Sequence, residues 1–192
     1  MTGRAEHFEQ LYQTRDDPWG YATSRYEAEK YAATLAALKR ARYASALELG
    51  CSIGVLSARL APRCDRLLSL DLVERAVAQA ARRLAPWPGA QARRAQLPRD
   101  WPDGRFDLIL LSELLYYLEK PEIHSLAGCV ARGATAGAEC VLVHYQGETG
   151  TDIRPDAARD LFCAELSAMR TVEHVDHPSP ADYNHRTLLL RD

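Results

Sequence analysis

The sequence reads Ala46-Leu47-Glu48-Leu49-Gly50-Cys51-Ser52-Ile53-Gly54 at the point that decides the fold. This apolar run breaks into a turn bounded by two glycines, so residues 46–49 are predicted to form a short buried strand and residues 54–61 a helix. Gly50 can adopt a positive φ and leaves room for a ligand beside the backbone, while Gly54 is expected to let the helix pack against the strand. A strand, a tight glycine turn and a helix are typical of a nucleotide-type site in an α/β sheet.

A carboxylate ends the next predicted strand, residues 66–71, because Asp71 lies 21 positions after Gly50. An acidic residue there can accept hydrogen bonds from both hydroxyls of an adenosine ribose. The glycine positions of a dinucleotide fingerprint are filled by Gly50, Ser52 and Val55, so two of its three glycines are missing. No Gly-Lys-Ser/Thr tripeptide follows, which argues against a P-loop. The motif that remains, Glu-x-Gly-x-x-x-Gly with a strand-end Asp, resembles the first two cofactor motifs of the class I S-adenosylmethionine-dependent methyltransferases.

The composition of the chain limits its possible functions. Its 192 residues suit a single domain, which we expect to be a methyltransferase domain with an N-terminal helical cap or lid at residues 1–42 and a Rossmann-like core at residues 43–192. With 24 basic and 26 acidic residues, the formal charge of −2 gives no broad positive field for a nucleic acid. Five cysteines, odd in number and without a Cys-x-x-Cys pair, favour reduced thiols in a cytoplasmic protein and predict no bound metal.

No apolar run approaches the roughly 18 residues of a membrane span. The first 30 residues also lack the apolar region of an export signal. We therefore expect a protein without membrane attachment, present as a monomer or a homodimer.

Strands and helices alternate along the rest of the chain. The predicted strands are residues 90–95, 106–111, 141–143, 169–175 and 186–190, and the predicted helices are residues 73–84, 122–132 and 156–166. This order predicts an α/β fold of three layers with a mostly parallel seven-stranded sheet. The resemblance to class I methyltransferases implies a Rossmann-like fold with an antiparallel strand at the C-terminal end of the sheet. Ligands of such sheets bind beyond the carboxyl ends of the strands. The residues expected to converge there are Gly50, Asp71, Gln96, Ser112, Glu113, His144 and Tyr145.

The N-terminal region precedes the first strand and carries two helical patterns, at residues 3–14 and 24–38. In the second, Ser24 and Glu27 form a capping-box pattern, and Glu27 and Lys30 are expected to lie largely off the apolar face. Between the helices, Asp17-Pro18-Trp19-Gly20-Tyr21 forms a turn dense in aromatic residues. Two interpretations stay open for this turn: a plug that covers the sheet edge, and a lid over the ligand.

Several segments resemble one branch of the class, the nodulation protein S family of small methyltransferases. The matching segments are residues 17–21, 31–38, 48–56, 106–109 and 112–118, within a region of roughly residues 8–145. The string Gly-Cys-Ser-Ile-Gly and the Trp-Gly-Tyr turn are more specific than the class motif. The resemblance implies S-adenosylmethionine as cofactor and, from the named activity of the family, N-methylation of an amino sugar or a similar small molecule.

The resemblance also implies a set of cofactor-binding residues. These are Glu48, Gly50, Cys51, Gly54, Asp71, Leu72, Gln96, Leu97 and Ser112. In the resembled class the loop after the third strand holds the adenine, and an acid often receives the adenine amino group. Gln96 stands at that position here, and its side-chain carbonyl can still accept the hydrogen bond.

The acceptor half of the site is predicted from residue chemistry. An amine must lose its proton before attack, and His144 or Glu113 could remove or orient that proton, with Tyr117 as a further catalytic candidate. His144 could instead close its strand by a hydrogen bond to the backbone, and Glu113 could be a carboxylate favoured by a helix start. The aromatic residues that could stack on a sugar ring are Trp19, Tyr21, Tyr116 and Tyr145.

Two other functions stay open at this stage. The chain could methylate a hydroxyl or carboxyl of a small metabolite, or it could bind S-adenosylmethionine without turnover as the partner of a second subunit. The cofactor motifs fit all of these functions, because they describe only the methyl donor.

Overall fold

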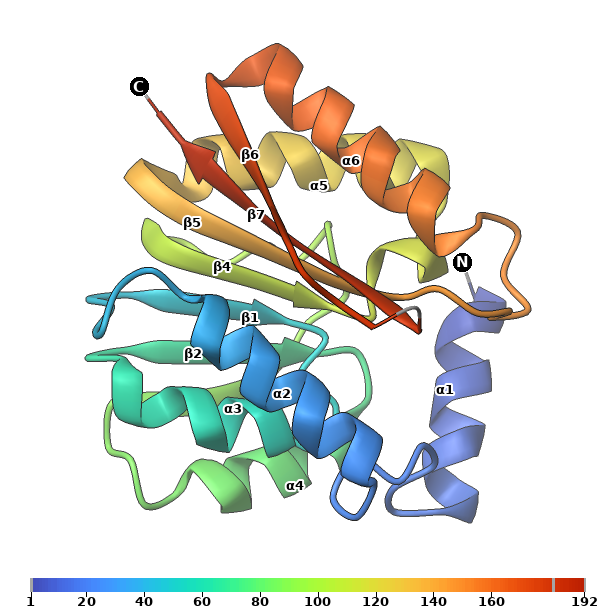
Figure 1. The fold of residues 1–192 in the computed structure, drawn as a ribbon. Helices are drawn as coiled ribbons and strands as arrows, with labels where there is room; N and C mark the ends of the chain where they lie inside the picture. Colours follow the sequence, from blue (N-terminus) through green and yellow to red (C-terminus); the bar gives the residue numbers. More distant parts are fainter. Residues whose placement is uncertain (1, 181, 192) are drawn as a thin grey trace.

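The computed structural model describes residues 2–180 and 182–191. Within these residues, seven strands form one sheet in the order β3-β2-β1-β4-β5-β7-β6 (Figure 1). The strands are β1 Ala46–Leu49, β2 Leu67–Asp71, β3 Ala90–Arg94, β4 Phe106–Ser112, β5 Ala134–Tyr145, β6 Val172–His177 and β7 Tyr183–Leu190.

The sheet is parallel except at its C-terminal end. Strands β3, β2, β1, β4 and β5 run parallel, whereas β7 is antiparallel to both of its neighbours, β5 and β6. At the centre, Leu47 of β1 pairs with Leu68 of β2 and with Ile109 of β4. The strand order reverses between β1 and β4, where α/β sheets bind ligands. The predicted fold class is confirmed.

Helices cover both faces of the sheet. They are α1 Thr2–Thr14, α2 Arg25–Ala37, α3 Val55–Leu60, α4 Glu74–Leu84, α5 Lys120–Gly133 and α6 Pro155–Met169, with short 3-10 turns η1 Ala61–Arg63 and η2 Leu115–Tyr117. Helices α5 and α6 lie on one face, and α2, α3 and α4 lie on the other (Figure 1). Helix α1 stands beyond the end of the sheet toward which β1, β2 and β4 point (Figure 1).

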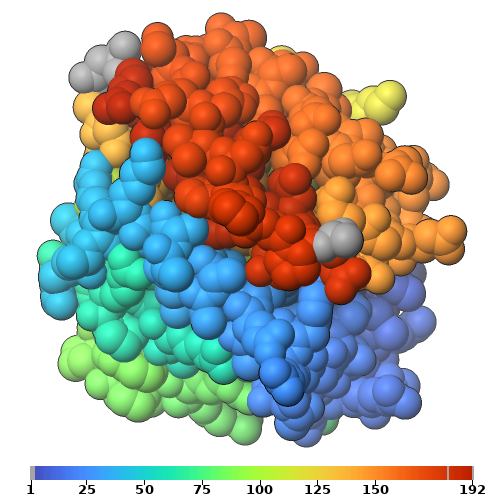
Figure 2. Space-filling model, in the orientation of Figure 1, coloured from blue at the N-terminus to red at the C-terminus, as the bar shows by residue number. Residues whose placement is uncertain are grey.

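Alternating side chains of the strands build two cores. Leu47 and Ile109 belong to the core that contains Phe162 of α6. Leu108 belongs to the opposite core with Leu60 of α3. Because parallel strands are buried on both faces, they appear in the sequence as continuous apolar runs. On the second face α2 lies side by side with the β6–β7 hairpin (Figure 2), where α2 contacts the hairpin through an aromatic pair.

The predicted limits of β5, β6 and β7 were wrong, and β7 begins at Tyr183 instead of residue 186. Strand β5 spans Ala134–Tyr145 instead of residues 141–143, because its first residues pair with the start of β4 across a register shift. His144 and Tyr145 therefore lie within β5, paired with β7. Helix α6 continues to Met169, so β6 begins at Val172 and not at residue 169.

Two local predictions near α2 and α3 also need correction. A Cβ on Gly54 would lie 2.7 Å from Ala80 of α4, so Gly54 allows α3 to pack against α4 rather than against the strand. Ser24 caps α2 by accepting a hydrogen bond from the Glu27 amide at 3.3 Å. The Glu27 carboxylate pairs with Lys30, and both side chains are buried instead of lying off the packed face.

The structure reports less on the remaining predictions. No helix in the described ranges is long and apolar enough to cross a bilayer. The division into a cap at residues 1–42 and a core at residues 43–192 stays a prediction, although α1 and α2 both precede β1.

Candidate active site

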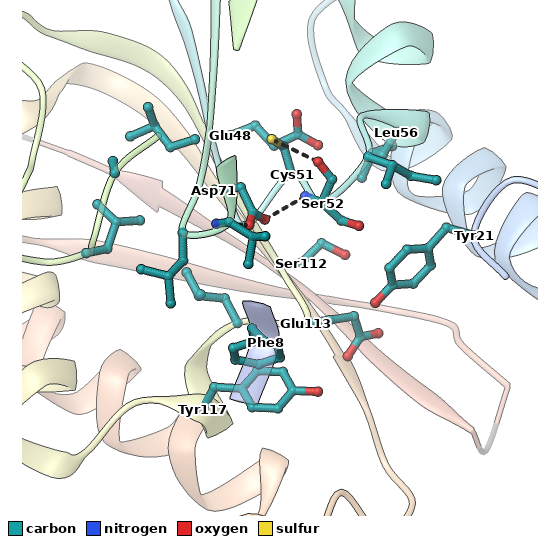
Figure 3. Close-up of a pocket in the computed structure, with 18 of the residues that line it drawn as sticks. Phe8, Tyr21, Glu48, Cys51, Ser52, Leu56, Asp71, Ser112, Glu113 and Tyr117 are labelled. Carbon is teal, nitrogen blue, oxygen red and sulfur yellow. Dashed lines mark hydrogen bonds between the residues drawn. The ribbon is translucent and has the colours of Figure 1, made fainter. Parts of the chain in front are cut away.

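A cavity of about 1030 Å³, including the open space at its mouth, lies at the carboxyl ends of β1, β2 and β4 (Figure 3). The predicted site residues that line it are Trp19, Tyr21, Glu48, Gly50, Cys51, Asp71, Leu72, Gln96, Leu97, Ser112, Glu113 and Tyr117. The predicted site residues outside the lining are Gly54, Tyr116, His144 and Tyr145.

The glycine turn, residues 50–54, forms one end of the cavity. Gly50 and Gly54 have φ values of +82° and +79°, and Ser52, which is not glycine, has a φ of +50°. The amides of Gly50 and Cys51 donate to the Leu70 carbonyl at 2.8 and 2.9 Å and fasten the turn to β2. The left-handed conformation explains why glycine, which has no Cβ, is favoured at positions 50 and 54.

Asp71 ends β2 beside this turn. Its Oδ2 accepts a hydrogen bond from the Ser52 amide at 2.7 Å, and its Oδ1 accepts one from the Val73 amide at 3.0 Å. Burial raises the pKa of the Asp71 carboxyl, and the amide hydrogen bonds oppose this effect. A carboxylate offers about four acceptor sites, so Asp71 keeps capacity for a further donor from the cavity beside these amides and that of Leu72.

Glu48 contributes a second buried carboxylate at the glycine-turn end, with 2% of its surface exposed. Its Oε2 accepts hydrogen bonds from Ser57 of α3 at 2.5 Å and from Ser69 of β2 at 2.7 Å. Burial raises the pKa of Glu48, and the two serine hydroxyls oppose this effect. Neither serine was among the predicted site residues, because an isolated serine in a strand or helix carries no sequence signal.

Glu113 lies at the opposite end of the cavity, with Tyr21 and Tyr117 (Figure 3). Its backbone has a φ of +54°, and its carboxylate accepts hydrogen bonds at both oxygens. Oε1 accepts from Lys30 Nζ at 2.7 Å, and Oε2 accepts from the Tyr116 hydroxyl at 2.7 Å and the Tyr145 amide at 2.8 Å. The carboxylate is therefore part of a buried ion network rather than a helix-start group.

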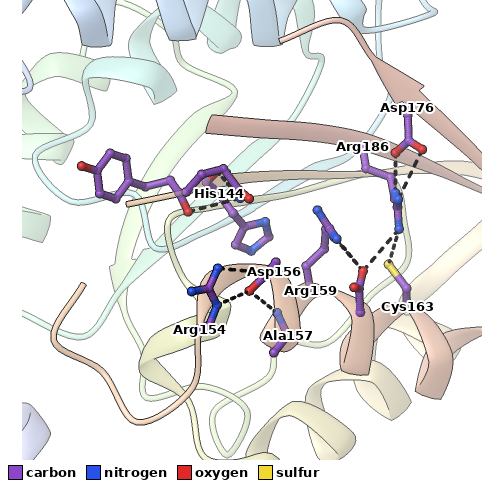
Figure 4. A network of polar contacts seen from close by, with 11 residues as sticks. His144, Arg154, Asp156, Ala157, Arg159, Cys163, Asp176 and Arg186 are labelled. Atoms are coloured by element: carbon purple, nitrogen blue, oxygen red, sulfur yellow. Dashed lines mark hydrogen bonds and ion pairs between the residues drawn. The ribbon is translucent and has the colours of Figure 1, made fainter. Parts of the chain in front are cut away.

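His144 is turned away from this cavity. Its side chain is fully buried, and within the described residues neither ring nitrogen has a hydrogen-bond partner. Burial lowers the pKa of His144 to about 4. The Glu113 carboxylate opposes this effect, and the charge of Arg159 on α6 adds to it. The ring lies on the α6 side of the sheet (Figure 4). This position supports neither predicted role, because the ring does not line the cavity and makes no hydrogen bond to the backbone.

Tyr116 and Tyr145 support the site from outside. The Tyr116 hydroxyl and the Tyr145 amide hold Glu113, while the Tyr145 ring is exposed at the surface. The structure therefore does not bring either ring to the place where a sugar could stack inside the cavity.

The N-terminal region closes the cavity with aromatic side chains. Phe8 and Tyr12 of α1 and Trp19 and Tyr21 of the turn all line it. Trp19 stacks on Tyr21 with ring centroids 5.6 Å apart, and the Tyr12 hydroxyl lies 2.5 Å from the hydroxyl of Ser52. These contacts are compatible with both the plug and the lid, because the turn packs against the molecule and also lines the cavity.

Arg4 holds α1 in this place. Its guanidinium donates two hydrogen bonds to the Glu122 carboxylate, at 2.7 and 2.8 Å, and one to the Tyr117 carbonyl at 2.7 Å. Within the described chain, Arg4 is the one basic side chain of the cavity lining, and Glu122 pairs with its charge. In the same part of the chain, no three or more His, Cys, Asp or Glu residues are grouped to hold a metal ion.

Comparison with known proteins places the chain in a family. The model of the family described as Nodulation protein S matches residues 5–131. The chain belongs to this family. Nodulation protein S of Bradyrhizobium diazoefficiens is 37% identical over 112 residues, which are 57% of this chain and 54% of that protein. Nodulation protein S of Sinorhizobium fredii is 31% identical over 155 residues, covering 66% and 69% of the two chains. The match to the first of these relatives thus spans about half of its length.

Solved structures share the fold. A putative methyltransferase from Pseudomonas syringae is 36% identical, with a TM-score of 0.71 over 88% of this chain and 100% of that chain. The N-methyltransferase NodS from Bradyrhizobium japonicum WM9, in complex with S-adenosyl-L-homocysteine, has a TM-score of 0.82 at 22% identity. This match covers 98% of this chain and 99% of that chain. The fold is therefore the Rossmann-like fold of class I methyltransferases.

The family match includes most of the cavity wall. Glu113 and Lys30 both lie within residues 5–131, whereas His144 lies beyond them. Our sequence reasoning missed Lys30, together with the α1 residues Arg4, Phe8 and Tyr12. The available signal for Lys30 was its spacing from Glu27 and Thr34, which puts three polar residues on one helix face at positions i, i+3 and i+7.

Proposed function

We propose that this chain is an S-adenosylmethionine-dependent methyltransferase that methylates the amino group of a sugar or a similar small acceptor. Family membership and the relative named as an N-methyltransferase support the proposal. The observation that carries it is the division of the cavity into two ends. A glycine turn with a backbone-held carboxylate forms one end, and an aromatic wall with the Glu113 carboxylate forms the other.

The residues at the glycine-turn end fit the methyl donor. Asp71 would accept hydrogen bonds from the ribose hydroxyls, because its oxygens face the cavity with acceptor capacity left over. Gly50 would let the ligand approach the backbone, and Gln96 and Leu97 would lie against the adenine. When bound, S-adenosylmethionine supplies a methyl group already activated on a sulfonium. The protein then has to hold the acceptor at near-attack distance, a contribution that can reach about 7–11 kcal/mol.

The charges of the lining favour an amine over an anionic acceptor. Its carboxylates are Glu48, Asp71 and Glu113, and the charge of Arg4 is paired with Glu122 outside the lining. This surplus of negative charge attracts a cationic group and repels carboxylates and phosphates. No histidine lines the described cavity, and Glu113 already accepts three hydrogen bonds. A hydroxyl acceptor needs a stronger base than a sugar amine does, because an amine loses its proton near neutral pH.

The test is product formation. The protein is incubated with S-adenosylmethionine and a chitin oligosaccharide deacetylated at its non-reducing end, with the fully acetylated oligosaccharide as the matched control. We expect release of S-adenosylhomocysteine from the free amine alone, and mass spectrometry should locate the new methyl group on nitrogen. A methyl group on oxygen from a wider acceptor panel would replace this proposal with an O-methyltransferase. Cofactor binding without product from any acceptor would favour a non-catalytic partner subunit.

The turn at residues 17–21 is proposed to act as a lid over the acceptor. We expect Trp19→Ala to leave the affinity for S-adenosylhomocysteine within a few-fold but to reduce turnover by about tenfold or more, since closure excludes water and completes the site. Amide exchange over residues 15–23 should slow when S-adenosylhomocysteine is added. The matched control is Trp87→Ala, because Trp87 packs against the core behind α4 and does not line the cavity. A plug predicts a lower melting temperature, unchanged activity per folded molecule, and exchange that ignores the ligand.

A further inference from the structure

Lys30 of α2 is a buried cation with two carboxylate partners. Its side chain is 3% exposed, and its Nζ donates to Glu27 Oε1 at 2.9 Å and to Glu113 Oε1 at 2.7 Å. Burying charged groups costs desolvation free energy that their mutual attraction often fails to recover, so such a cluster is weak evidence for stability alone. Its position beside the cavity suggests a functional role.

Lys30 is linked to the cavity through Glu113. Glu113 lines the cavity, whereas Lys30 and Glu27 do not. The ammonium therefore reaches Glu113 from behind the wall and does not compete with a ligand for space. With one cation and two carboxylates, the cluster carries one net negative charge, and the member that meets the cavity is Glu113.

The conformation of Glu113 is held from several directions. Its backbone lies in the left-handed region, which a residue with a side chain adopts only when its surroundings enforce it. The Glu113 amide donates to the Val143 carbonyl at 2.9 Å, and Tyr116 and Tyr145 occupy Oε2. Lys30 donates to the other oxygen, Oε1, so a variant without Lys30 would leave Oε1 without this hydrogen bond from α2.

We infer that Lys30 is a positioning residue of the acceptor end, where its ammonium holds the Glu113 carboxylate turned toward the cavity. In this position the Glu113 carboxylate faces a positively charged group at the reacting centre. This inference rests on the function proposed above, and it assigns a role to a residue that does not touch the acceptor.

The other titratable groups around Glu113 do not change charge near neutral pH. They are Tyr21, Tyr26, Tyr31, Tyr116, Tyr117 and His144. Burial raises the pKa of each of these phenols above its ordinary value and lowers the pKa of His144 to about 4.

The test compares two ligands by calorimetry from pH 5 to pH 9. Sinefungin carries an amino group where S-adenosylmethionine carries its transferable methyl group, and S-adenosylhomocysteine carries a neutral sulfur there. We expect the wild-type protein to prefer sinefungin about tenfold or more near pH 7, because a carboxylate attracts the ammonium. A substitution that damages the cavity in general weakens the binding of both ligands alike, so the ratio of their dissociation constants reports on the amino group alone.

Lys30→Met should reduce this preference about fivefold or more, because the Glu113 carboxylate loses the donor to Oε1 that holds it toward the cavity. Lys30→Arg should retain most of the wild-type response. Lys30→Met leaves the carboxylates of Glu27 and Glu113 without their cation. The double variant Lys30→Met with Glu27→Gln removes the Glu27 charge, so it keeps the test available if the single variant does not fold. Lys39→Met, at an exposed lysine just after α2, is the matched control.

The outcomes separate the two proposals. If neither ligand binds the wild-type protein, the proposed cofactor is wrong and this inference fails with it. If both ligands bind but the preference is absent, or is the same in wild type and Lys30→Met at every pH, the inference is overturned and the proposed function stands. A lower melting temperature of Lys30→Met with an unchanged preference would reduce Lys30 to a structural role.

Discussion

Replacement of Gly50 by valine is expected to lower the affinity for S-adenosylhomocysteine by about 100-fold or more, which corresponds to about 2.8 kcal/mol. Gly50 has a φ of +82° and lines the cavity, so a branched side chain would both oppose the backbone conformation and occupy the approach of the ligand. A Cβ at this position would lie 3.6 Å from Leu114 and from the Ser112 carbonyl, which is ordinary contact. The protein itself therefore has room for a small side chain here.

The variant is still expected to fold. A non-glycine residue held in the left-handed region costs about 1–3 kcal/mol, against a typical stability of about 5–15 kcal/mol for a domain. Gly150→Val is the matched control, because Gly150 also has a positive φ, of +67°, but has open space around it and does not line the cavity. Calorimetry of both folded variants gives the answer. Normal affinity in Gly50→Val would mean that the ligand binds elsewhere.

Replacement of Asp71 by alanine should raise the dissociation constant of S-adenosylhomocysteine by about tenfold or more. Hydrogen bonds to a charged acceptor contribute about 1.5–3 kcal/mol each, and two ribose hydroxyls are expected to donate to this carboxylate. The structure adds a second expectation. The amides of Ser52 and Val73 would lose their acceptor, so the free energy of unfolding should fall by about 1–3 kcal/mol for each amide left unpaired.

Asp65→Ala is the control for Asp71→Ala. Asp65 lies just before the other end of β2, where it forms an exposed ion pair with Arg42 at 2.5 Å. Exposed pairs of this kind contribute about 0–1 kcal/mol, so neither stability nor affinity should change much. An Asp71→Ala protein that is folded and binds S-adenosylhomocysteine with wild-type affinity would remove Asp71 from the ribose site.

The sequence by itself determined the parts of the molecule that depend on neighbouring residues. The strand at residues 46–49 and the turn between Gly50 and Gly54 are local, because the apolar run and the glycines lie next to one another. The fold class followed from the alternation of strands and helices, because right-handed crossovers leave few arrangements for such an order. The strand ends that form the glycine-turn end of the cavity could therefore be predicted together.

The tertiary structure alone decided which polar residues meet. Lys30 and Glu113 are 83 positions apart, and their contact at 2.7 Å depends on where α2 packs relative to the segment that follows β4. His144 lies near the end of β5 and Glu113 comes directly after β4, yet His144 is buried behind the sheet and Glu113 lines the cavity. A strand turns successive side chains to opposite faces, so a difference of one residue in register reverses the direction of a side chain. That register is set by pairing and packing with distant segments, and the sequence around a single residue does not contain it.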